Sequence, residues 1–314
     1  MSSVAQLLKH APDFNVASAE AIAEELFGIR GHAQSLPSER DQNFLVTDRS
    51  GEKFVLKIAN ALESRAFLEA QNAALRHVAQ RVSFCPSLVI DEIATVKAHS
   101  VRVVRYLPGV PLAQIRPHKP ALLRDVGRKL GQLSHALSDF DHPAVHREFH
   151  WDLANGNRVI DEFAPLVEDA SLREMVLGCK VEFKSALRRS VIHGDANDYN
   201  VLVDPERMIV TGLLDFGDMV YSYTVGELAI AIAYVVLDKP DPRAAADQVI
   251  EGYASEFRLF EEELEMLWPL VRLRLAMSVC IAASQLREQP ENEYLRISQK
   301  SIETSLPRLI LGHG

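Results

Sequence analysis

The sequence predicts an α+β fold with two lobes, a small N-terminal lobe built on an antiparallel sheet and a larger, mostly helical C-terminal lobe. Short strand-like segments are concentrated in residues 31–106, whereas apolar residues at helical spacing dominate from residue 107 onward. A chain of 314 residues, 47% of them hydrophobic, is long enough to bury a core in each part. We therefore expect an N-terminal lobe at 1–106 and a C-terminal lobe at 107–314.

Local signals predict the elements of the N-terminal lobe. A helix within residues 1–30 is expected to open at Ser18, as its N-cap, and to end at Gly28. The turn Asp48-Arg-Ser-Gly51 predicts a hairpin between the strands that flank it. The expected strands are Gly31–Leu36, Asn43–Thr47, Lys53–Ile58, Leu88–Ile90 and Val101–Tyr106, and a helix is expected over Ala61–Arg81.

In the C-terminal lobe, helices are expected around one central hairpin. Asp241-Pro242 is an N-cap followed by proline at the first helical position, and it starts a helix that runs to about Phe257. The acidic segment Glu261–Glu265 is expected in solvent, and Pro269 is expected to begin the next helix. The other expected helices are Pro120–Leu137, Ala170–Arg189 approximately, Val225–Val236 and Pro269–Arg287.

Composition excludes several functional classes. The net charge is −9, so no overall positive field favours nucleic acid or an anionic membrane. The three cysteines are scattered without metal-ligand spacing, which fits reduced thiols in a cytoplasm. Leu228–Leu237 is too short to cross a bilayer, and Leu264–Leu286 contains Pro269, Arg272 and Arg274. With no signal peptide recognised, we expect a cytoplasmic protein that binds neither membrane nor nucleic acid.

The side chains that could carry out catalysis or bind metal are concentrated in residues 191–218. The apolar runs Val201–Val203 and Met208–Leu214 are separated by a turn at Asp204-Pro205-Glu206, which predicts a β-hairpin. Pairing of its strands should bring His193, Asp195, Asn200 and Asp215 into one small volume. Two carboxylates and an amide oxygen suit Mg²⁺ held between protein and phosphates, because hard cations take oxygen ligands. A carboxylate that is not bound to metal can accept a proton from a substrate hydroxyl.

Lys57 lies in the strand-like segment Phe54-Val-Leu-Lys-Ile58. Such a lysine is either a charge that protects a sheet edge or a ligand of phosphate. Here it lies on the third expected strand, ahead of a helix and upstream of the His193, Asn200 and Asp215 motifs. That order is typical of the kinase signature, in which the strand lysine contacts the α- and β-phosphates. We therefore favour phosphate binding.

His193-Gly-Asp195, Asn200 and Asp215-Phe-Gly217 resemble the motifs of the aminoglycoside phosphotransferase family of small-molecule kinases. The resemblance extends from about Gly31 to about Leu286. Trp151-Asp-Leu-Ala154, HGDANDYNVLV and LLDFGDMVYSYTVGELAIAIAY look most like the hydroxylysine kinase branch of that family. The resemblance implies a protein-kinase-like two-lobed fold and a kinase that binds a nucleotide and a small molecule.

The resemblance also implies roles for individual residues. Asp195 is expected to be the catalytic base or the carboxylate that orients the hydroxyl, and Asn200 and Asp215 are expected to hold Mg²⁺. Lys57 is expected to bind the phosphates of ATP or GTP. For His193 we favour support of the loop by hydrogen bonding over direct participation in the reaction.

The nucleotide site departs from the protein-kinase pattern because no GxGxxG run is present. Its place falls to Pro37–Asn43, where backbone N–H groups and the Ser38 hydroxyl are candidates for phosphate binding, and where Glu39 and Asp41 would repel phosphate if turned inward. The helix residue that supports Lys57 is left open between Gln71, Glu69 and Glu63. Arg105, Tyr106 and Leu107 form the expected hinge that binds the purine edge, the alternative being a plain strand leading into a turn.

A cationic acceptor would require carboxylates beyond the phosphoryl site. Asp152, Asp218 and Glu227 are the candidates, and Asp218 is equally suited to capping the next segment. Trp151 either packs on an ammonium group or belongs to the core. The histidines at 142, 146 and 150 have spacings of a polar loop rather than of a metal site.

The sequence thus predicts transfer of the γ-phosphate of Mg²⁺-bound ATP or GTP to the hydroxyl of a small, amine-bearing metabolite such as hydroxylysine. Alternative acceptors are choline or ethanolamine, homoserine, methylthioribose and aminoglycosides. Outside the enzyme class, the alternatives are a nucleotide-binding pseudokinase and a structural adaptor. The acceptor, the choice between ATP and GTP, and the oligomeric state are left open.

Overall fold

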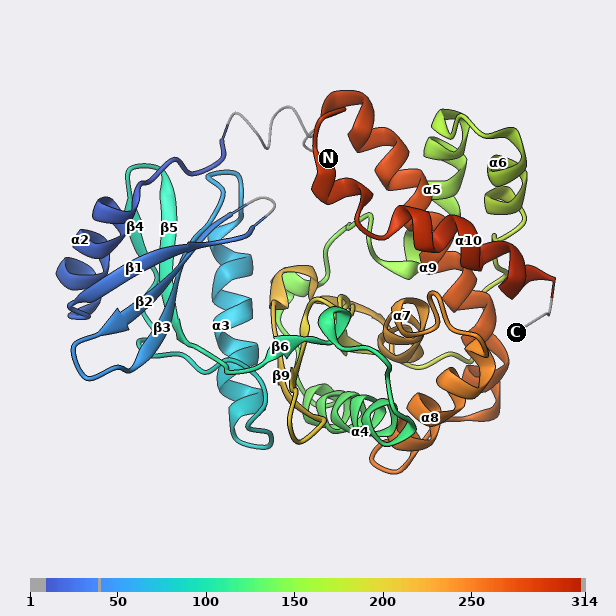
Figure 1. Cartoon of the computed structure of the whole chain (residues 1–314), viewed down its shortest axis with the longest axis horizontal. Helices are drawn as coiled ribbons and strands as arrows, with labels where there is room; N and C mark the ends of the chain where they lie inside the picture. The colour runs from blue at the N-terminus through green and yellow to red at the C-terminus, as the bar shows by residue number, and fades with distance from the viewer. Residues whose placement is uncertain (1–9, 39–40, 312–314) are drawn as a thin grey trace. The chain divides into compact units, whose positions relative to one another are not determined.

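The computed structural model describes residues 10–38 and 41–311, apart from the side chains of residues 293 and 294 (Figure 1). The chain divides into two compact units, Met1–Leu107 and Pro108–Gly314. The boundary predicted from the sequence lies one residue earlier. Each unit has its own layered core, and each is described separately below.

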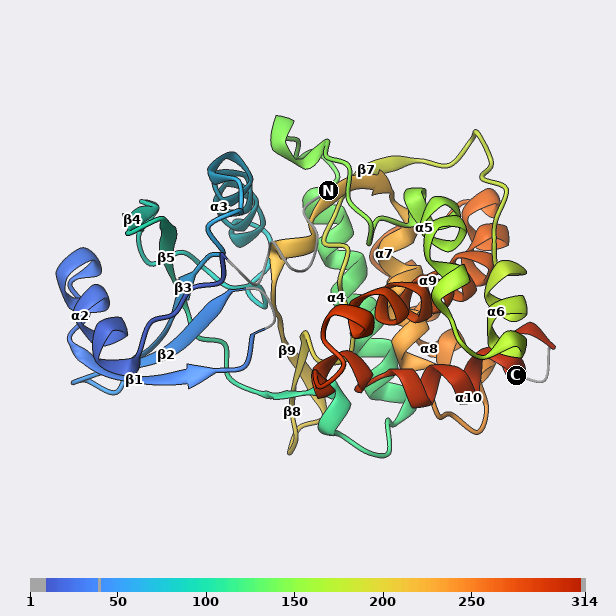
Figure 2. The same cartoon turned by 90° about the horizontal axis from the view of Figure 1, so that it is seen from above.

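Unit 1 is built on a five-stranded antiparallel sheet with strand order β1-β2-β3-β5-β4. Helix α2 lies on one face of this sheet and α3 on the other (Figures 1 and 2). The strands are β1 (Gly31–Leu36), β2 (Gln42–Asp48), β3 (Lys53–Ile58), β4 (Ala94–Val96) and β5 (His99–Arg105), and the helices are α2 (Val16–Phe27) and α3 (Arg65–Ala79).

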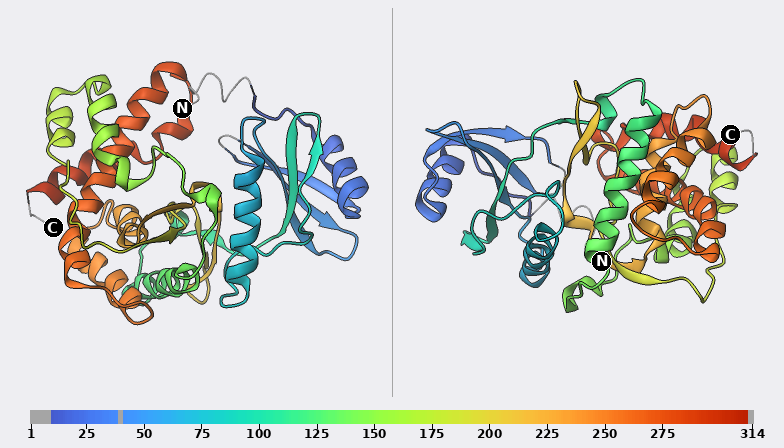
Figure 3. Two further views of the ribbon diagram at one scale, coloured as in Figure 1. Left: turned by 180° about the vertical axis from the view of Figure 1, so that it is seen from behind. Right: turned by 90° about the horizontal axis from the view of Figure 1, so that it is seen from below.

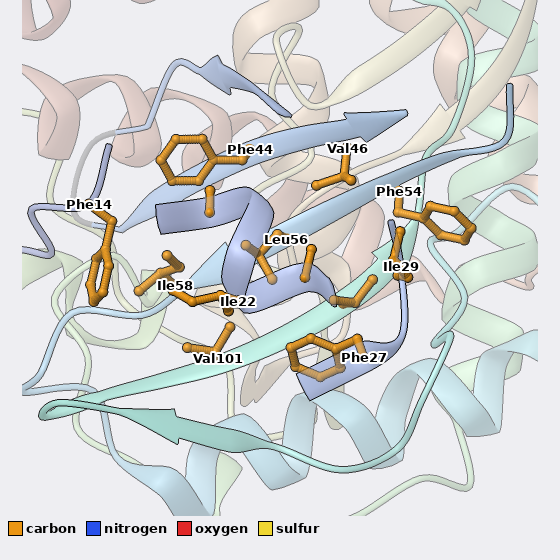
Figure 4. Packing of buried hydrophobic residues seen from close by; sticks show 13 residues of the cluster. Phe14, Ile22, Phe27, Ile29, Phe44, Val46, Phe54, Leu56, Ile58 and Val101 are labelled. Carbon is orange, nitrogen blue, oxygen red and sulfur yellow. The ribbon is translucent and has the colours of Figure 1, made fainter. Parts of the chain in front are cut away.

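The face of the sheet toward α2 is the apolar core of unit 1. Phe44, Leu56 and Val101 alternate with outward residues along their strands and pack with Ile22 of α2 (Figure 4). The opposite face carries Lys57 of β3, whose cross-strand partner on β5 is Arg102. Because successive side chains on a strand point to opposite faces, these two cations point away from the apolar core.

Several expectations for unit 1 need correction. Helix α2 begins at Val16 because Asn15, not Ser18, is the N-cap: its side chain accepts the N–H of Ser18 at 2.8 Å. Gly28 ends the helix as predicted, with φ +67°. The expected strand Leu88–Ile90 forms only an isolated bridge from Leu88 to Val104. Instead, β4 completes the sheet, since it joins β5 through a short turn.

Unit 2 is a helical assembly with two small sheets, one of order β6-β8-β9 and one that pairs β10 with β7. Its helices are α4 (Pro120–Leu137), α5 (Gly156–Phe163), α6 (Ala170–Leu177), α7 (Val225–Val235), α8 (Pro242–Ala254), α9 (Glu261–Glu288) and α10 (Gln299–Ile310). Its strands are β6 (Val110–Pro111), β7 (Arg189–Ile192), β8 (Val201–Asp204), β9 (Ile209–Leu213) and β10 (Val220–Tyr223).

Helices α4 and α8 lie side by side (Figures 1 and 3). Glycine permits their close approach: a Cβ on Gly252 of α8 would lie 1.9 Å from the carbonyl oxygen of Arg124 on α4. Gly127 of α4 meets α8 in the same way, with Val249 O at 1.9 Å from its hypothetical Cβ. The two backbones therefore touch without intervening side chains.

Helix α9 corrects two predictions. Pro269 does not begin a helix but lies inside one that starts at Glu261, because apolar residues on both sides of it share one buried face. Within the acidic segment expected in solvent, Glu263 is buried and pairs with Arg188 at 2.6 Å. Helix α9 is the one described helix long and apolar enough to cross a membrane, but 78% of its apolar window is buried inside the protein. It is a core helix.

The remaining differences in unit 2 concern short elements. The helix expected over Ala170–Arg189 ends at Leu177, where Gly178 follows. Strands β7 and β10, which flank the central hairpin, were not expected, and they are four residues each. The hairpin itself is confirmed as β8 and β9, with Val201 opposite Leu213.

Candidate active site

The loop between β7 and β8 carries His193-Gly194-Asp195. Gly194 has φ +80°, and a Cβ there would lie 2.7 Å from the carbonyl oxygen of Asp218. Only glycine fits this turn without strain. The backbone of the loop is thereby brought against the segment that follows Asp215.

Asp195 is held on both carboxylate oxygens. Oδ1 accepts from the Asn197 side chain at 3.0 Å and from Arg274 Nη2 at 3.1 Å. Oδ2 accepts from the Asn200 side chain at 2.7 Å. The same amide nitrogen also donates to the Asp195 carbonyl at 2.9 Å, which leaves the Asn200 amide oxygen as its ligand atom for a cation. Sequence reasoning therefore brought Asp195 and Asn200 together correctly.

The hairpin places Asp215 beside Asn200, because the N–H of Leu214 donates to the carbonyl of Asn200 at 2.8 Å. Asp215 has φ +64°, which is uncommon for a residue other than glycine. Its carboxylate accepts the Gly217 N–H at 3.0 Å and is exposed. A strained backbone thus presents a carboxylate to solvent next to an amide oxygen.

His193 and Glu227 hold the backbone of this loop through hydrogen bonds. His193 is completely buried; its Nε2 lies 2.8 Å from the Leu214 carbonyl, and its Nδ1 accepts the N–H of Asp195. With Nδ1 as acceptor, Nε2 carries the proton and donates to Leu214. The carboxylate of Glu227, on the first turn of α7, accepts the His193 N–H at 2.6 Å. These bonds give His193 a supporting role, in agreement with the role we favoured.

The surroundings of Asp195 raise the pKa of its carboxyl group. Burial raises its pKa above the ordinary value, and the negative charges of Asp218 and Asp215 raise it further, while Arg274 and Asn197 act in the opposite direction. The side chain keeps 22% of its surface exposed, so solvent moderates the effect of burial. A carboxylate in this position remains open to a substrate hydroxyl.

Arg274 is the functional residue that sequence reasoning missed. It lies on α9 and is 1% exposed, and its Nη1 donates to the Trp151 carbonyl at 3.0 Å. The guanidinium stacks 4.5 Å from the centroid of Trp151 and 5.8 Å from that of Tyr234. An arginine inside the apolar stretch Leu270–Ala282 was the available signal, because a buried guanidinium requires a partner.

The three carboxylates expected to bind a cationic acceptor have little exposed surface. Asp152 is 7% exposed and accepts from Ser222 Oγ and from the Ala154 N–H, so it caps a short helix. Glu227 is 0% exposed and bound to the loop backbone. Both carboxylates are therefore enclosed by protein, and their role in binding the acceptor stays a prediction. Asp218 is 8% exposed, and its charge acts on Asp195 and Arg274.

In unit 1, Lys57 is half-buried on β3, and the choice among its three candidate supports stays open. Gln71 Oε1 accepts from Arg102, Glu69 pairs with Arg65 at 3.1 Å, and Glu63 accepts the Ser64 N–H at 3.0 Å. Arg102 is 5% exposed and also donates to Asn72 Oδ1 at 3.1 Å. A buried arginine therefore binds Gln71, one of the three candidates.

Of the expected phosphate loop, the structure describes the residues on either side of 39–40. Ser38 is exposed, and its Oγ accepts from the Asn43 side chain at 3.2 Å, while Glu39 lies outside the described residues. Asp41 accepts the N–H of Asn60 at 3.0 Å.

At the hinge, Arg105 N–H donates to Ser87 O at 2.8 Å and Tyr106 N–H donates to Lys53 O at 3.1 Å. The Arg105 side chain pairs with Glu52. Within the described chain, Leu107 is the hinge residue whose N–H donates to no protein oxygen.

The protein oxygens at Asn200 and Asp215 fit a magnesium ion better than a resident structural metal. In residues 10–38 and 41–311, no group of three or more His, Cys, Asp or Glu side chains could form a metal cage. Mg²⁺ is usually bound through one or two carboxylates together with substrate phosphates and water. A single exposed carboxylate beside an amide oxygen matches that donor set.

The comparisons agree with this geometry. Residues 32–264 match the phosphotransferase enzyme family. The chain is 33% identical to hydroxylysine kinase of Mus musculus, in an alignment that covers 92% of this chain and 88% of the relative. It is 30% identical to hydroxylysine kinase of Danio rerio, with 95% and 92% covered.

Among solved structures, a microcompartment-associated aminopropanol kinase matches with a TM-score of 0.69 at 18% identity, over 92% of this chain and 96% of that chain. Amicoumacin kinase hAmiN, in complex with AMP-PNP, Ca²⁺ and its ligand, matches with a TM-score of 0.67 at 12% identity, over 87% of each chain. At such identities the likeness shows the fold alone, and it confirms the predicted kinase-like fold.

A sheet-based unit followed by a helical unit that carries the Asp195 loop is the arrangement of the kinase fold. The chain belongs to the phosphotransferase enzyme family, and it is a small-molecule kinase that takes its phosphoryl group from a nucleotide.

Proposed function

We propose that this kinase transfers the γ-phosphoryl group of Mg²⁺-bound ATP or GTP to the hydroxyl group of hydroxylysine. The observation that carries the proposal is the geometry of Asp195, whose two oxygens are fixed by Asn200 and Arg274 beside the exposed carboxylate of Asp215. The similarity to hydroxylysine kinases over nine-tenths of the chain supports this acceptor among the small alcohols considered.

In this mechanism Asp195 accepts a hydrogen bond from the acceptor hydroxyl and aligns its oxygen for attack. Asp195 takes up the hydroxyl proton as the oxygen bonds to the γ-phosphorus and the nucleoside diphosphate leaves with the bridging oxygen. Asn200 and Asp215 would hold Mg²⁺, which when bound neutralises charge on the phosphates. Arg274 keeps the Asp195 carboxylate in one orientation, and His193 keeps the loop backbone in place. Most of the rate enhancement then comes from positioning and charge stabilisation, because the transition state of phosphoryl transfer is loose.

For the donor, we propose that Lys57 binds the phosphates and that the N–H of Leu107 binds the purine edge. Ser38 adds a hydroxyl donor from the loop between β1 and β2. The Leu107 assignment is supported by the backbone bonds that already occupy Arg105 and Tyr106.

A coupled nucleotide assay over a panel of acceptors tests the proposal. Hydroxylysine should give the highest kcat/KM, ahead of choline, ethanolamine, homoserine, methylthioribose and aminoglycosides. Asp195→Asn should abolish transfer while nucleotide affinity, measured by calorimetry, stays within about twofold, because the amide keeps the shape but cannot accept the proton.

Asp204→Asn is the matched control, since Asp204 lies in the hairpin turn of the same segment and caps it through its side-chain oxygen. It should retain the wild-type rate. Nucleotide binding without turnover of any acceptor would instead indicate a pseudokinase.

A further inference from the structure

A cluster of cations in unit 2 has no assigned role in phosphoryl transfer. Arg116 and His118 belong to the segment before α4, and Lys239 lies between α7 and α8. Lys239 Nζ lies 2.9 Å from Nδ1 of His118, and the Arg116 guanidinium contacts the other ring nitrogen. Two cationic side chains thus share one imidazole.

The imidazole does not compensate their charge. Burial, followed by the charge of Lys239, lowers the pKa of His118 to about 4, so the ring is neutral near pH 7. Burial, followed by the charge of Arg116, lowers the pKa of Lys239 to about 8, although the charges of Asp198 and Asp238 act in the opposite direction. In the part of the chain that the structure describes, no acidic side chain forms an ion pair with Arg116 or Lys239.

The cluster lies beside the loop that carries Asp195. The N–H of Ala113, three residues before Arg116, donates to the carbonyl of Asp198 at 2.9 Å. Burial raises the pKa of the Asp198 carboxyl, and the charges of Arg116 and Lys239 both act in the opposite direction. Asp198 follows Asp195 by three residues, a separation that spans at most about 10 Å. The cluster and the Asp195 carboxylate thus lie on neighbouring parts of the same loop region.

We propose that Arg116 and Lys239 bind the carboxylate of the acceptor, and that Asp198 binds its α-ammonium group. This places an α-amino acid, rather than a simple amino alcohol, in the acceptor site. Two cations and one carboxylate that are close but not ion-paired to one another match the zwitterion of an amino acid, with a charge of each sign. The inference rests on the proposed function and deepens it.

The inference separates the acceptors that the sequence left open. Hydroxylysine and homoserine carry a carboxylate, whereas choline, ethanolamine, methylthioribose and aminoglycosides do not. A guanidinium can bind a carboxylate through two parallel hydrogen bonds, and the ammonium of Lys239 supplies a point charge beside it. Acceptors without a carboxylate would bring no anion to either cation.

The test compares hydroxylysine with its decarboxylated diamine as acceptors of the full-length enzyme. For the wild type, kcat/KM should be about 10- to 100-fold higher for hydroxylysine, the usual effect of losing a charged hydrogen bond. Arg116→Gln and Lys239→Met should each remove most of that difference by lowering kcat/KM for hydroxylysine alone. The KM for the nucleotide should not change, and Lys119→Gln, which removes a neighbouring exposed cation, should match the wild type.

Three results would overturn the inference. A wild type that uses both acceptors equally well does not recognise the carboxylate, although it is still a kinase of these amines. Variants that lose activity equally on both acceptors show a structural role for the cluster, and thermal unfolding of each variant identifies this case. A wild type that phosphorylates neither acceptor refutes the proposed function itself, and the inference fails with it.

Discussion

At the scale of single residues, the site depends on how charges are fixed around Asp195. Arg274 contributes the one cation that directly contacts this carboxylate in the described chain, and it is held in turn by the Trp151 carbonyl and by two aromatic rings. Removing one partner of a buried ion pair is costly because the other charge is left without compensation.

We expect Arg274→Met to lower kcat by at least about tenfold, since an unbraced Asp195 samples orientations that do not align the hydroxyl. The free energy of unfolding should also fall, by about 3 kcal/mol. Arg272→Met, two residues earlier on α9 and only partly buried, is the control and should leave kcat unchanged. Steady-state kinetics and denaturant titration measure both effects, and a wild-type kcat for Arg274→Met would remove Arg274 from the site.

A substitution at Asp215 can remove the negative charge without changing the strained backbone conformation. Asn tolerates the left-handed region, and its amide oxygen can still accept the Gly217 N–H, so Asp215→Asn should fold like the wild type. Its affinity for Mg²⁺-nucleotide should nevertheless fall by about tenfold or more, because a hard cation prefers a carboxylate. Calorimetry with and without Mg²⁺ checks this, and equal affinities with Mg²⁺ would place the metal elsewhere.

At the scale of elements, the packing of α4 against α8 depends on glycine. Adding one methyl group at Gly252 would force the helix backbones apart, and such overpacking typically costs about 1–3 kcal/mol. We therefore expect Gly252→Ala to lower the melting temperature clearly. Gly178→Ala, at the end of α6, is the matched control: its nearest neighbour would lie 3.4 Å away and its backbone is helical, so stability should not fall. Differential scanning calorimetry distinguishes the two variants.

The elements that the sequence predicted correctly are those with strong local signals. Helix α4 has a proline at its first position and a regular apolar face, and β1 to β3 are punctuated by a clear turn. Helix α9 was predicted wrongly because Pro269 is a local breaker, whereas tertiary burial on both sides overrides it. Strands β7 and β10 are four residues each, too short to show a period, and they exist only because they pair with one another.

The same distinction applies to the site. The convergence of Asp195, Asn200 and Asp215 follows from the register of one hairpin, which a local pattern can predict. The contact of Arg274 with Asp195 joins residues 79 positions apart, and the contact of Arg102 with Gln71 joins residues 31 apart. No local pattern encodes such pairs, and the burial of Asp152 and Glu227 was not foreseen for the same reason, because it depends on distant segments.

At the scale of the whole molecule, the proposed roles divide between the two units. Lys57 belongs to unit 1, whereas Asp195, Asn200 and Asp215 belong to unit 2. We expect Lys57→Met to reduce nucleotide affinity about tenfold or more without lowering the affinity for hydroxylysine, since the lysine is proposed to contact the phosphates alone. Lys53→Met, on the same strand but exposed, is the control. Calorimetric titration with each ligand separates the effects, and a loss of acceptor binding in Lys57→Met would contradict this division.

Helix α9 carries an ion pair in its first turn and, further along, the arginine that contacts Asp195. Its first turn is anchored by Glu263 to Arg188, and Arg274 reaches Asp195 eleven residues later on the same rigid rod. One residue added to or deleted from the intervening stretch would rotate the guanidinium by about 100° around the helix axis, away from the carboxylate. The number of residues between these two ion pairs therefore cannot change without breaking one of them.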